Sequence, residues 1–310
     1  MTFEDFFEEW KSEVPYIEAR TSGSTGEPKI IRLSKDFVKE SALRTNRFFS
    51  VSSRSRLHSC VSADFIGGKM MAVRSELAGC RFSHETPSNR PLGSFCAADS
   101  LDLVAVVPSQ LIHILDNIRE MPSIGAMIIG GSAIDVRLRA RVEKSGLNAY
   151  ETYGMTETSS HIALRKVREK EDWFETLDGI KVGSDSRGCL VIRFSSGEEI
   201  VTNDLAQISG DRMFKITGRW DHVIITGGKK VNPYDVERKI SMLVNAPYMI
   251  TSRADLKWGR MVVLLIEGSE ESEKLELLSD LKSVLDPWEV PKVIEWVRHL
   301  PRTANGKLKR

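Results

Sequence analysis

Residues 126–144 read AMIIGGSAIDVRLRARVEK, and this stretch indicates the fold class of the chain. The apolar run from Ala126 to Ile129 is typical of a buried strand, and the two glycines and the serine after it are typical of a turn. A helical pattern then extends from about Val136 to Lys144. A buried strand, a short turn and a helix in that order form the repeating unit of α/β folds with a largely parallel sheet.

The same order of elements precedes this stretch. Apolar strand patterns at 57–62 and 103–107 are each followed by a helical pattern, at 69–78 and 108–118 respectively. Three such pairs in succession indicate an α/β fold with a largely parallel sheet.

The N-terminal region predicts a helix and two short strands. Residues 3–11 carry four aromatic side chains at helical spacing, and residues 17–20 and 30–33 have strand patterns. Ser34 is expected to cap a helix that begins at Lys35.

The pattern changes after residue 180, where short strands separated by turns replace the strand-and-helix pairs. These strands are expected at 189–194, 199–201, 206–209 and 213–217. A smaller unit follows Gly218, with strands and helices at 223–226, 233–243, 261–267, 273–284 and 293–296. We therefore predict a large α/β domain with mixed and parallel sheets over residues 1–218, and a small α+β domain over 219–310 joined to it by a hinge.

The composition is that of an ordinary globular protein. The 310 residues include 44 Lys and Arg against 43 Asp and Glu, and the net charge of +1 gives no electrostatic footprint for nucleic acid or an anionic membrane. The acidic N-terminus lacks the basic region of a signal peptide, and no stretch reaches the ~20 apolar residues of a membrane span. The four cysteines are scattered without a CxxC pair, so we expect neither a disulfide framework nor a structural zinc site. A cytoplasmic protein is expected.

Four loops carry residues suited to nucleotide chemistry. The first, residues 21–29, reads TSGSTGEPK and holds two glycines, four hydroxyl groups and a lysine. Glycine backbone N–H groups and hydroxyls suit a chain of phosphates, although the spacing is not that of a Walker A loop. Clusters of serine, threonine and glycine also form ordinary surface turns, and composition alone leaves that alternative open.

The second loop, residues 153–158, reads YGMTET and follows the strand-like segment 148–151. The ring of Tyr153 could stack on a base, the hydroxyl of Thr156 could bind a phosphate oxygen, and the carboxylate of Glu157 could hold Mg²⁺. The Thr-Glu pair is equally typical of a helix start, where an acidic residue is favoured in the first turn.

The third and fourth loops lie in the C-terminal part of the chain. Residues 218–221 read GRWD, and Arg219 together with Asp204 could bind ribose hydroxyls; the alternative is a purely structural strand pair with a hairpin at Gly227-Gly228. The last ten residues read PRTANGKLKR, in which the Asn-Gly turn would direct the side chain of Lys307. Basic tails of this kind are otherwise simply solvated.

Taken in this order, the four loops resemble the adenylate-forming superfamily of acyl-CoA synthetases, peptide-synthetase adenylation domains and luciferases. TSGSTGEPK resembles the phosphate loop of that superfamily, IIGGS at 128–132 its adenine-contacting segment, and YGMTET its aromatic-Gly-x-Thr-Glu motif. Asn203-Asp204 stands where the superfamily usually has Gly-Asp, and Arg219 to Asp221 matches its Arg-x-Asp hinge. PRTANGKLKR resembles its C-terminal lysine motif, so the resemblance extends from about residue 19 to 310.

The resemblance implies a role for individual residues. Lys307 would act in catalysis with Thr156 and Glu157, and Glu157 would also hold Mg²⁺. Asp221 would be the hinge, and the turn at Gly227, Gly228 and Lys229 would admit CoA. ATP and AMP would be bound by Thr21, Ser22, Gly23, Ser24, Thr25, Gly26, Lys29, Gly130, Gly131, Ser132, Tyr153, Gly154, Thr156, Asp204 and Arg219.

One departure from the superfamily concerns length. Its members normally carry well over a hundred residues before the phosphate loop, whereas here that loop begins at Thr21. Most of the first N-terminal subdomain is therefore expected to be missing. This leaves part of the pocket wall and the formation of a homo-oligomer open, but it removes none of the motifs.

Two features resemble the o-succinylbenzoate–CoA ligase family of menaquinone biosynthesis. One is YGMTETSSHIAL, in which small polar residues including Ser160 follow the motif, and the other is IGGKMMAVR at 66–74, a helix that contains Gly68 and Arg74. A substrate with a second carboxylate needs a cation to receive it, and arginine binds carboxylates through two parallel hydrogen bonds. The alternative for Arg74 is a surface position paired with Glu76.

The resemblance implies two half-reactions on small-molecule substrates. A carboxylate attacks the α-phosphate of Mg·ATP to give an acyl-adenylate and pyrophosphate, and the thiol of CoA then displaces AMP after the small domain turns about the hinge. The expected acid is o-succinylbenzoate. The alternatives are another aryl or acyl acid, a peptide-synthetase adenylation domain, luciferase-like chemistry and a non-catalytic nucleotide-binding relative.

Overall fold

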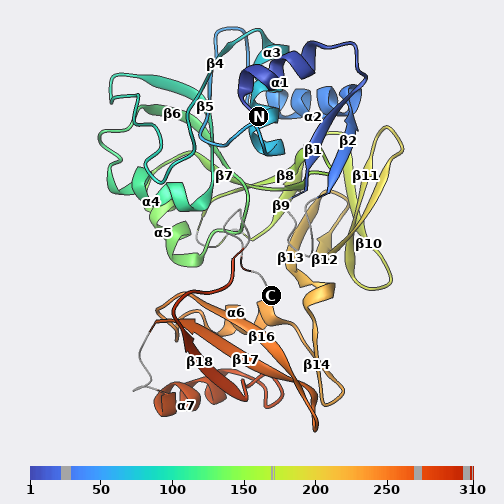
Figure 1. Ribbon diagram of the computed structural model, residues 1–310, viewed down its shortest axis with the longest axis vertical. Helices are drawn as coiled ribbons and strands as arrows, with labels where there is room; N and C mark the ends of the chain where they lie inside the picture. Colours follow the sequence, from blue (N-terminus) through green and yellow to red (C-terminus); the bar gives the residue numbers. More distant parts are fainter. Residues whose placement is uncertain (22–28, 169, 171, 269–273, 303–307, 309) are drawn as a thin grey trace. The chain divides into compact units, whose positions relative to one another are not determined.

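The computed structural model describes residues 1–21, 29–168, 170, 172–268, 274–302, 308 and 310 (Figure 1). The chain divides into two compact units, Met1–Lys181 and Val182–Arg310. The domain boundary expected between residues 218 and 219 differs from this division and stays a prediction. The expected α/β fold class is confirmed. No helix in the described part of the chain is long and apolar enough to cross a membrane.

The first unit is organised around a sheet whose centre is parallel. Its strand order is β9-β8-β7-β6-β5-β3-β4, in which β4, β3, β5, β6 and β7 are parallel and the β7–β8 and β8–β9 pairs are antiparallel. The elements are α1 (Phe3–Lys11), β1 (Tyr16–Arg20), β2 (Ile30–Ser34), α2 (Lys35–Phe48), β3 (Arg56–Ser59), α3 (Ile66–Ala78), β4 (Arg81–His84), β5 (Ser100–Val106), α4 (Pro108–Asp116), β6 (Ser123–Ile129), α5 (Val136–Ser145), β7 (Ala149–Met155), β8 (Ser160–Lys166) and β9 (Phe174–Thr176).

Helices cover both faces of the parallel strands. Val104 of β5 and Met127 of β6 pack in one cluster with Leu111 of α4 and Leu138 of α5. The alternate β5 residue Leu103 is fully buried as well, and α3 contacts β3, β4 and β5. Burial on both faces explains why these strands read as continuous apolar runs rather than as an alternating pattern.

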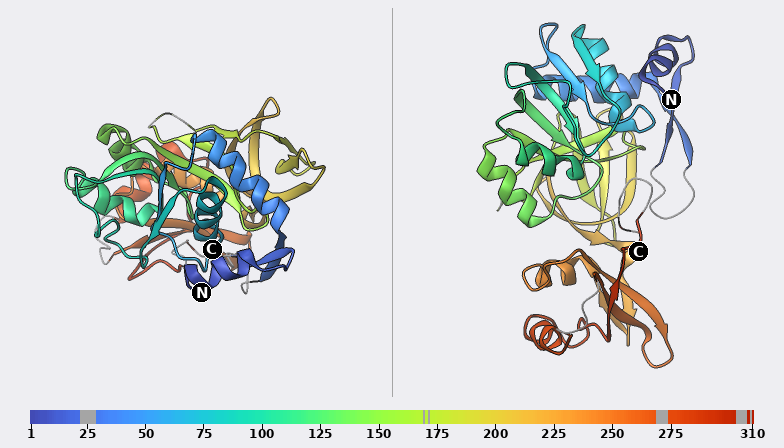
Figure 2. Two further views of the ribbon diagram at one scale, coloured as in Figure 1. Left: turned by 90° about the horizontal axis from the view of Figure 1, so that it is seen from above. Right: turned by 60° about the vertical axis from the view of Figure 1, so that its left-hand side comes forward.

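The N-terminal elements form a second cluster, in which α1, α2 and α3 gather beside the antiparallel β1–β2 hairpin (Figures 1 and 2). Ser34 caps α2 as expected, since its hydroxyl accepts a hydrogen bond from the amide of Phe37 at 3.2 Å. The buried ammonium of Lys69 joins three elements, because it donates to the carbonyl of Glu18 at 2.6 Å and pairs with Glu9 at 3.2 Å.

The second unit contains an antiparallel set of strands and a small mixed sheet. Its first strands, in the order β10-β11-β12-β13, are β10 (Ile180–Ser184), which spans the division between the units, β11 (Cys189–Phe194), β12 (Glu199–Ser209) and β13 (Met213–Arg219). After η1 (Trp220–His222) come β14 (Ile224–Thr226), β15 (Lys229–Val231), α6 (Pro233–Ile240), β16 (Tyr248–Asp255), β17 (Gly259–Glu267), α7 (Lys274–Val284) and β18 (Val293–Val297).

The small sheet has the order β15-β14-β17-β16, with β18 parallel to β17, and α6 and α7 pack on its apolar side chains. Several strands of the second unit differ from expectation, and β10 is among those that were not predicted. β12 is continuous where separate strands at 199–201 and 206–209 were expected, because a β-bulge at Leu205 and Ala206 interrupts the side-chain alternation without ending the strand. β16 was not predicted, since its second half is polar and exposed and hides the pattern.

Candidate functional site

The neck of the first glycine-rich loop is closed by hydrogen bonds. The amide of Thr21 donates to the carbonyl of Lys29 at 2.9 Å, and the amide of Lys29 donates to the hydroxyl of Thr21 at 3.0 Å. These bonds extend the β1–β2 ladder beyond its last pair, Arg20 and Ile30, so the loop is held at the end of a hairpin. Ser22, Gly23, Ser24, Thr25 and Gly26, which the sequence also predicts to bind phosphates, lie outside the described residues.

The segment from Gly130 to Ser132 begins where β6 ends. The amide of Gly130 donates to the carbonyl of Val106 at 3.1 Å, and Gly131 has a φ of 96°, a conformation that side-chain-bearing residues rarely adopt. Gly131 and Ser132 are exposed. In open α/β sheets, ligands bind beyond the carboxyl ends of parallel strands, which is where this segment lies.

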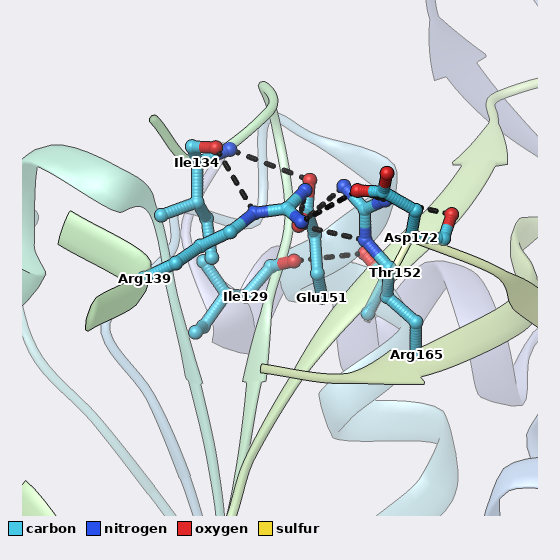
Figure 3. Close-up of polar contacts among 7 residues, drawn as sticks. All are labelled: Ile129, Ile134, Arg139, Glu151, Thr152, Arg165 and Asp172. Atoms are coloured by element: carbon cyan, nitrogen blue, oxygen red, sulfur yellow. Dashed lines mark hydrogen bonds and ion pairs between the residues drawn. The ribbon is translucent and has the colours of Figure 1, made fainter. Parts of the chain in front are cut away.

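A buried charge network supports this segment (Figure 3). The carboxylate of Glu151 on β7 accepts from the amide of Ile134 at 3.3 Å and from the guanidinium groups of Arg139 at 3.1 Å and Arg165 at 2.8 and 3.1 Å. Arg139 also donates to the carbonyl of Ile134 at 3.3 Å, and Asp172 pairs with Arg139 at 3.4 Å. The network therefore fixes the end of the 130–134 segment to β7 and β8.

The charge state of Glu151 reflects opposing effects. Burial raises the pKa of Glu151 to about 7, and the positive charge of Arg139 acts in the opposite direction. Three charge-assisted hydrogen bonds from guanidinium groups favour the ionised form, which needs them because a buried carboxylate without partners is very unfavourable. Above neutral pH the ionised carboxylate holds both guanidinium groups.

The end of β7 carries the second predicted loop. Gly154 has to be a glycine, because a Cβ there would lie 2.2 Å from the carbonyl oxygen of Ser160 and 2.4 Å from the Cα of His161. Tyr153 is half-buried, and its ring centroid lies 5.9 Å from that of Phe174. The aromatic ring thus stands beside the strand at the carboxyl edge of the sheet.

Thr156 joins this loop to the neck of the glycine-rich loop. Its buried hydroxyl donates to the carbonyl of Arg20 at 3.4 Å, and Arg20 immediately precedes Thr21. Glu157 is exposed, and its carboxylate forms no hydrogen bond or ion pair with another described residue. Residues 156–159 form a turn between β7 and β8, so the alternative of a helix start is not realised. The turn leaves Glu157 free to bind a cation.

Arg74 is fully buried in α3 and lacks a counterion among the described residues. Its Nη2 donates to the hydroxyl of Ser160 at 3.4 Å and its Nη1 lies 3.6 Å from the sulfur of Met71, while its Nε has no partner within the described chain. Burial lowers the pKa of Arg74 to about 9. The alternative of a surface position paired with Glu76 is wrong, because Arg74 is inaccessible and Glu76 pairs with Lys11.

The surroundings of Arg74 are neutral. Burial, followed by the positive charge of Arg74, holds the pKa of His161 well below its usual value, so the imidazole is uncharged. Its Nε2 lies 3.0 Å from the hydroxyl of Thr45. Gly68, also predicted to contact the acid, approaches the backbone of Ser62 so closely that a Cβ would lie 2.2 Å from its carbonyl oxygen. This contact alone requires a glycine there.

The predicted ribose and hinge residues of the second unit form one ionic cluster. Arg219 donates through Nε and Nη2 to both carboxylate oxygens of Asp221, at 2.8 and 2.7 Å, and through Nη1 to Asp204 at 3.1 Å. Burial opposes ionisation of Asp221, but the hydrogen bonds and charge of Arg219 leave its pKa below the usual value. The strand register accounts for the arrangement, because Asp204 of β12 is paired with Arg219 of β13.

The predicted CoA turn is a two-residue hairpin. Gly227 and Gly228 have φ values of 53° and 77° and join β14 to β15, as this turn type demands. A Cβ on Gly227 would lie 2.7 Å from the ring of Trp258. The ammonium of Lys229 lies 5.4 Å from the ring centroid of Trp288. The hairpin therefore presents backbone and a cation next to aromatic rings.

Lys307 lies outside the described residues, but both flanks of its segment are described. Arg302 and Leu308 form an antiparallel bridge, and the guanidinium of Arg310 pairs with Glu237 at 2.7 Å. The segment that contains Lys307 therefore begins and ends at anchored positions.

Residues 11–181 match the family model described as AMP-binding enzyme. The chain belongs to this family. The superfamily resemblance drawn from the four loops is therefore confirmed.

Several relatives and solved structures agree with this membership. The 2-succinylbenzoate–CoA ligase of Bacillus cereus (strain ZK / E33L) is 25% identical over 341 residues, which cover 94% of this chain and 67% of that relative. An acyl-CoA synthetase (AMP-forming)/AMP-acid ligase II-like protein from Dyadobacter fermentans is 31% identical, with a TM-score of 0.64 and coverage of 99% of this chain and 91% of that one. O-succinylbenzoate coenzyme A synthetase from Bacillus subtilis, solved with ATP and magnesium ion, is 20% identical with a TM-score of 0.78, over 94% of this chain and 68% of that one.

Sequence reasoning did not identify the residues that support the loops of this family member. Glu151, Arg139 and Arg165 come from a strand, a helix and another strand, and no spacing connects them. The one available signal was a glutamate at the end of the strand-like segment 148–151. A buried acidic residue in such a strand needs cationic partners, although the sequence does not say which.

The buried network gives a stability prediction. Glu151→Gln should lower the free energy of unfolding at pH 8 by about 3 kcal/mol, because it leaves two buried guanidinium groups without their carboxylate. Urea unfolding followed by circular dichroism measures the change. The exposed Glu120→Gln variant is the control and should stay within about 0.5 kcal/mol of the parent. A loss below about 1 kcal/mol in Glu151→Gln would contradict the supporting role of the carboxylate.

Proposed function

We propose that this chain is an ATP-dependent acid–thiol ligase that forms an acyl-adenylate and then an acyl-CoA thioester. The observation that carries the proposal is the hydrogen bond from Thr156 to the carbonyl of Arg20. It joins the turn that bears the unpartnered carboxylate of Glu157 to the neck of the glycine-rich loop. The neck of the loop that is predicted to bind phosphates thereby lies next to a carboxylate that is suited to a cation.

The first half-reaction brings two anions together, a carboxylate and the α-phosphate of ATP. The amides of the 21–29 loop would orient the phosphates, and the hydroxyl of Thr156 would join them by exchanging its hydrogen bond to Arg20 for a phosphate oxygen. Lys307 would stabilise the charge that develops on the transferring group. Glu157 fits Mg²⁺, because its carboxylate is exposed and has no partner among the residues that the structure describes. Bound there, Mg²⁺ would offset the negative charge of the phosphates.

Residues predicted from the sequence would bind the nucleotide's other groups. Tyr153 would stack on adenine, and the backbone from Gly130 to Ser132 would contact the edge of the base. In the second unit, Asp204 and Arg219 would bind the ribose. The second half-reaction would use the hairpin at Gly227 and Gly228, where the missing side chains leave room for the pantetheine arm of CoA.

For the acid we propose o-succinylbenzoate, which carries a second carboxylate. The support is Arg74, a buried guanidinium with an unpartnered Nε and a weak contact to Ser160. An uncompensated charge in a protein interior is strongly unfavourable, and a ligand carboxylate would neutralise it. Relatives of this chain carry the name 2-succinylbenzoate–CoA ligase, which agrees with this choice of acid.

The proposed activity is tested by AMP release from ATP, Mg²⁺ and CoA with a panel of acids. The panel comprises o-succinylbenzoate, benzoate, a medium-chain fatty acid and an amino acid. Preference for o-succinylbenzoate is the expected result. Preference for another acid would retain the ligase activity and reject the proposed substrate, and no AMP with any acid would reject the ligase.

A substitution at Arg74 should change substrate preference and folding stability in different directions. Arg74→Met should raise the free energy of unfolding without ligand by about 1–4 kcal/mol, because an apolar side chain replaces an unpaired buried charge. The same variant should lose the preference for o-succinylbenzoate over benzoate in kcat/KM. Arg47→Ala, at an exposed position of α2, is the control and should change neither quantity. Destabilisation of Arg74→Met with an unchanged preference would assign Arg74 a structural role.

Lys307→Ala should slow adenylation by ~10²–10³-fold, roughly 3–4 kcal/mol, the effect of removing one preorganised donor from a developing charge. ATP–pyrophosphate exchange measures this half-reaction alone. Lys309→Ala removes a neighbouring ammonium and should exchange at nearly the parental rate. Exchange by Lys307→Ala at the parental rate would exclude the proposed role of Lys307.

The hinge prediction concerns the second half-reaction. Asp221→Pro should reduce thioester formation about tenfold more than adenylation, because proline restricts the backbone where the small domain would turn. Asp221→Ala removes the same carboxylate but leaves the backbone free, so it separates loss of the Arg219 pair from loss of motion. Equal reduction of both half-reactions in Asp221→Pro would count against a hinge at this position.

A further inference from the structure

Three potential metal ligands that have no role assigned above converge in the first unit. His58, Cys60 and Glu85 each place one ligand atom in a group whose members all lie within 4.8 Å of one another. His58 and Cys60 are 1% exposed, and the Glu85 side chain is 17% exposed. A nitrogen, a sulfur and an oxygen ligand atom seldom lie so close together in a protein interior unless they have a function.

The sheet topology explains how the three residues meet. His58 lies on β3 and Cys60 directly follows that strand, so their side chains, two positions apart, point to the same face. β4 runs parallel to β3 with Ser59 paired to His84, and Glu85 follows His84 at the same edge. Strand register therefore brings Glu85 beside the other two residues.

The imidazole of His58 is oriented by a hydrogen bond on its other side. Its Nδ1 lies 2.9 Å from the hydroxyl of Ser83, and that hydroxyl is directed at the carbonyl of Leu57, at 3.5 Å. If that hydroxyl donates to the carbonyl, it accepts from Nδ1–H and Nε2 carries a lone pair; if it donates to Nδ1, Nε2 carries the proton. Nε2 is buried, has no hydrogen-bond partner among the described residues, and lies 3.9 Å from the Glu85 carboxylate.

The carboxylate of Glu85 is held in place as well. Both of its oxygens accept from the amide of Leu92, at 2.9 and 3.1 Å. Gln110 of α4 donates to the carbonyls of Cys60 and Ser88 at 3.1 Å each, so the loop after β4 is fixed over the group. The Glu85 carboxylate also interacts with the thiol of Cys60, and a lone pair on Nε2 would repel the carboxylate unless a cation lay between them.

Contrary to the expectation from the cysteine spacing, we propose that His58, Cys60 and Glu85 bind a divalent cation of the thiolate-binding class, for which Zn²⁺ is the best match. A set of one imidazole, one thiolate and one carboxylate suits Zn²⁺ and not Mg²⁺, which prefers oxygen alone. Tetrahedral bond lengths of about 2.0–2.3 Å require ligand atoms to be about 3.5 Å apart. The ligand atoms of the present group lie within 4.8 Å of one another, so side chains would have to move closer on binding. Water supplies the fourth ligand, and the thiol proton of Cys60 leaves on binding.

The site is independent of the ligase chemistry, since none of its ligands belongs to the proposed ATP, acid or CoA sites. A bound cation would join the ends of β3 and β4 to the loop that follows β4. Its consequence is therefore structural, and binding should raise the melting temperature of the first unit.

The test is a Co²⁺ titration of the full chain after treatment with EDTA. A thiolate-to-Co²⁺ absorption band in the near ultraviolet should appear and saturate at about one Co²⁺ per chain, and Zn²⁺ should abolish it. Cys60→Ser should remove the band, and His58→Gln or Glu85→Gln should weaken affinity by more than about 100-fold. Ser83→Ala, which frees the imidazole but removes no ligand, should weaken it about 10–100-fold.

Two cysteines provide matched controls. Cys189→Ser changes a buried thiol of the second unit and Cys96→Ser changes an exposed one, and both variants should bind like the parent. Circular dichroism melts identify any variant that fails to fold, and Glu85→Gln and Ser83→Ala then remain as independent tests. The proposal is overturned if the parent gives no thiolate band, if Cys60→Ser keeps it, or if a control cysteine variant loses it.

Discussion

The parallel pairing of β3, β5, β6 and β7 determines which loops of the first unit can meet. The carboxyl ends of parallel strands lie at one edge of a sheet, so the segments that follow β6 and β7 are neighbours in space. Thr156 then binds the carbonyl of Arg20 and brings the neck of the glycine-rich loop to that edge. Three segments distant in sequence thus form one candidate phosphate site, and none of them would form it alone. The group of His58, Cys60 and Glu85 arises from the same constraint on β3 and β4.

The first unit contains two buried charged side chains, Glu151 and Arg74, which differ in whether the chain provides partners of opposite charge. Glu151 accepts hydrogen bonds from two guanidinium groups and from a backbone amide, so residues of the chain supply the partners that its buried carboxylate needs. Arg74 has a hydroxyl and a sulfur nearby and no carboxylate among the described residues. The first arrangement stabilises the fold with or without a ligand. If Arg74 binds the acid as proposed, the second arrangement would lower the free energy of unfolding until the anion bound, and the unpaired charge would serve recognition.

Features that depend on residues close in sequence were predicted, whereas contacts that depend on strand pairing and register were not. The cap at Ser34 and the strand-and-helix order follow from local patterns, and the structure reproduces both. The partners of Glu151 and the meeting of Cys60 with Glu85 depend on which strands pair and in which register, and no local pattern encodes that. β12 shows the same limit, because a bulge that only the paired strand reveals made one strand look like two.

The cluster around Arg219 limits how the second unit can bind a ribose. A guanidinium has five N–H donors, and Asp221 and Asp204 already occupy three of them. Ribose hydroxyls would therefore have to use the two that remain or displace a carboxylate. Because Asp221 is also the predicted hinge residue, a change of its backbone conformation would release two donors of Arg219 at once. Nucleotide contacts and hinge conformation would then depend on the same pair of side chains, which gives the Arg-x-Asp spacing a physical reason.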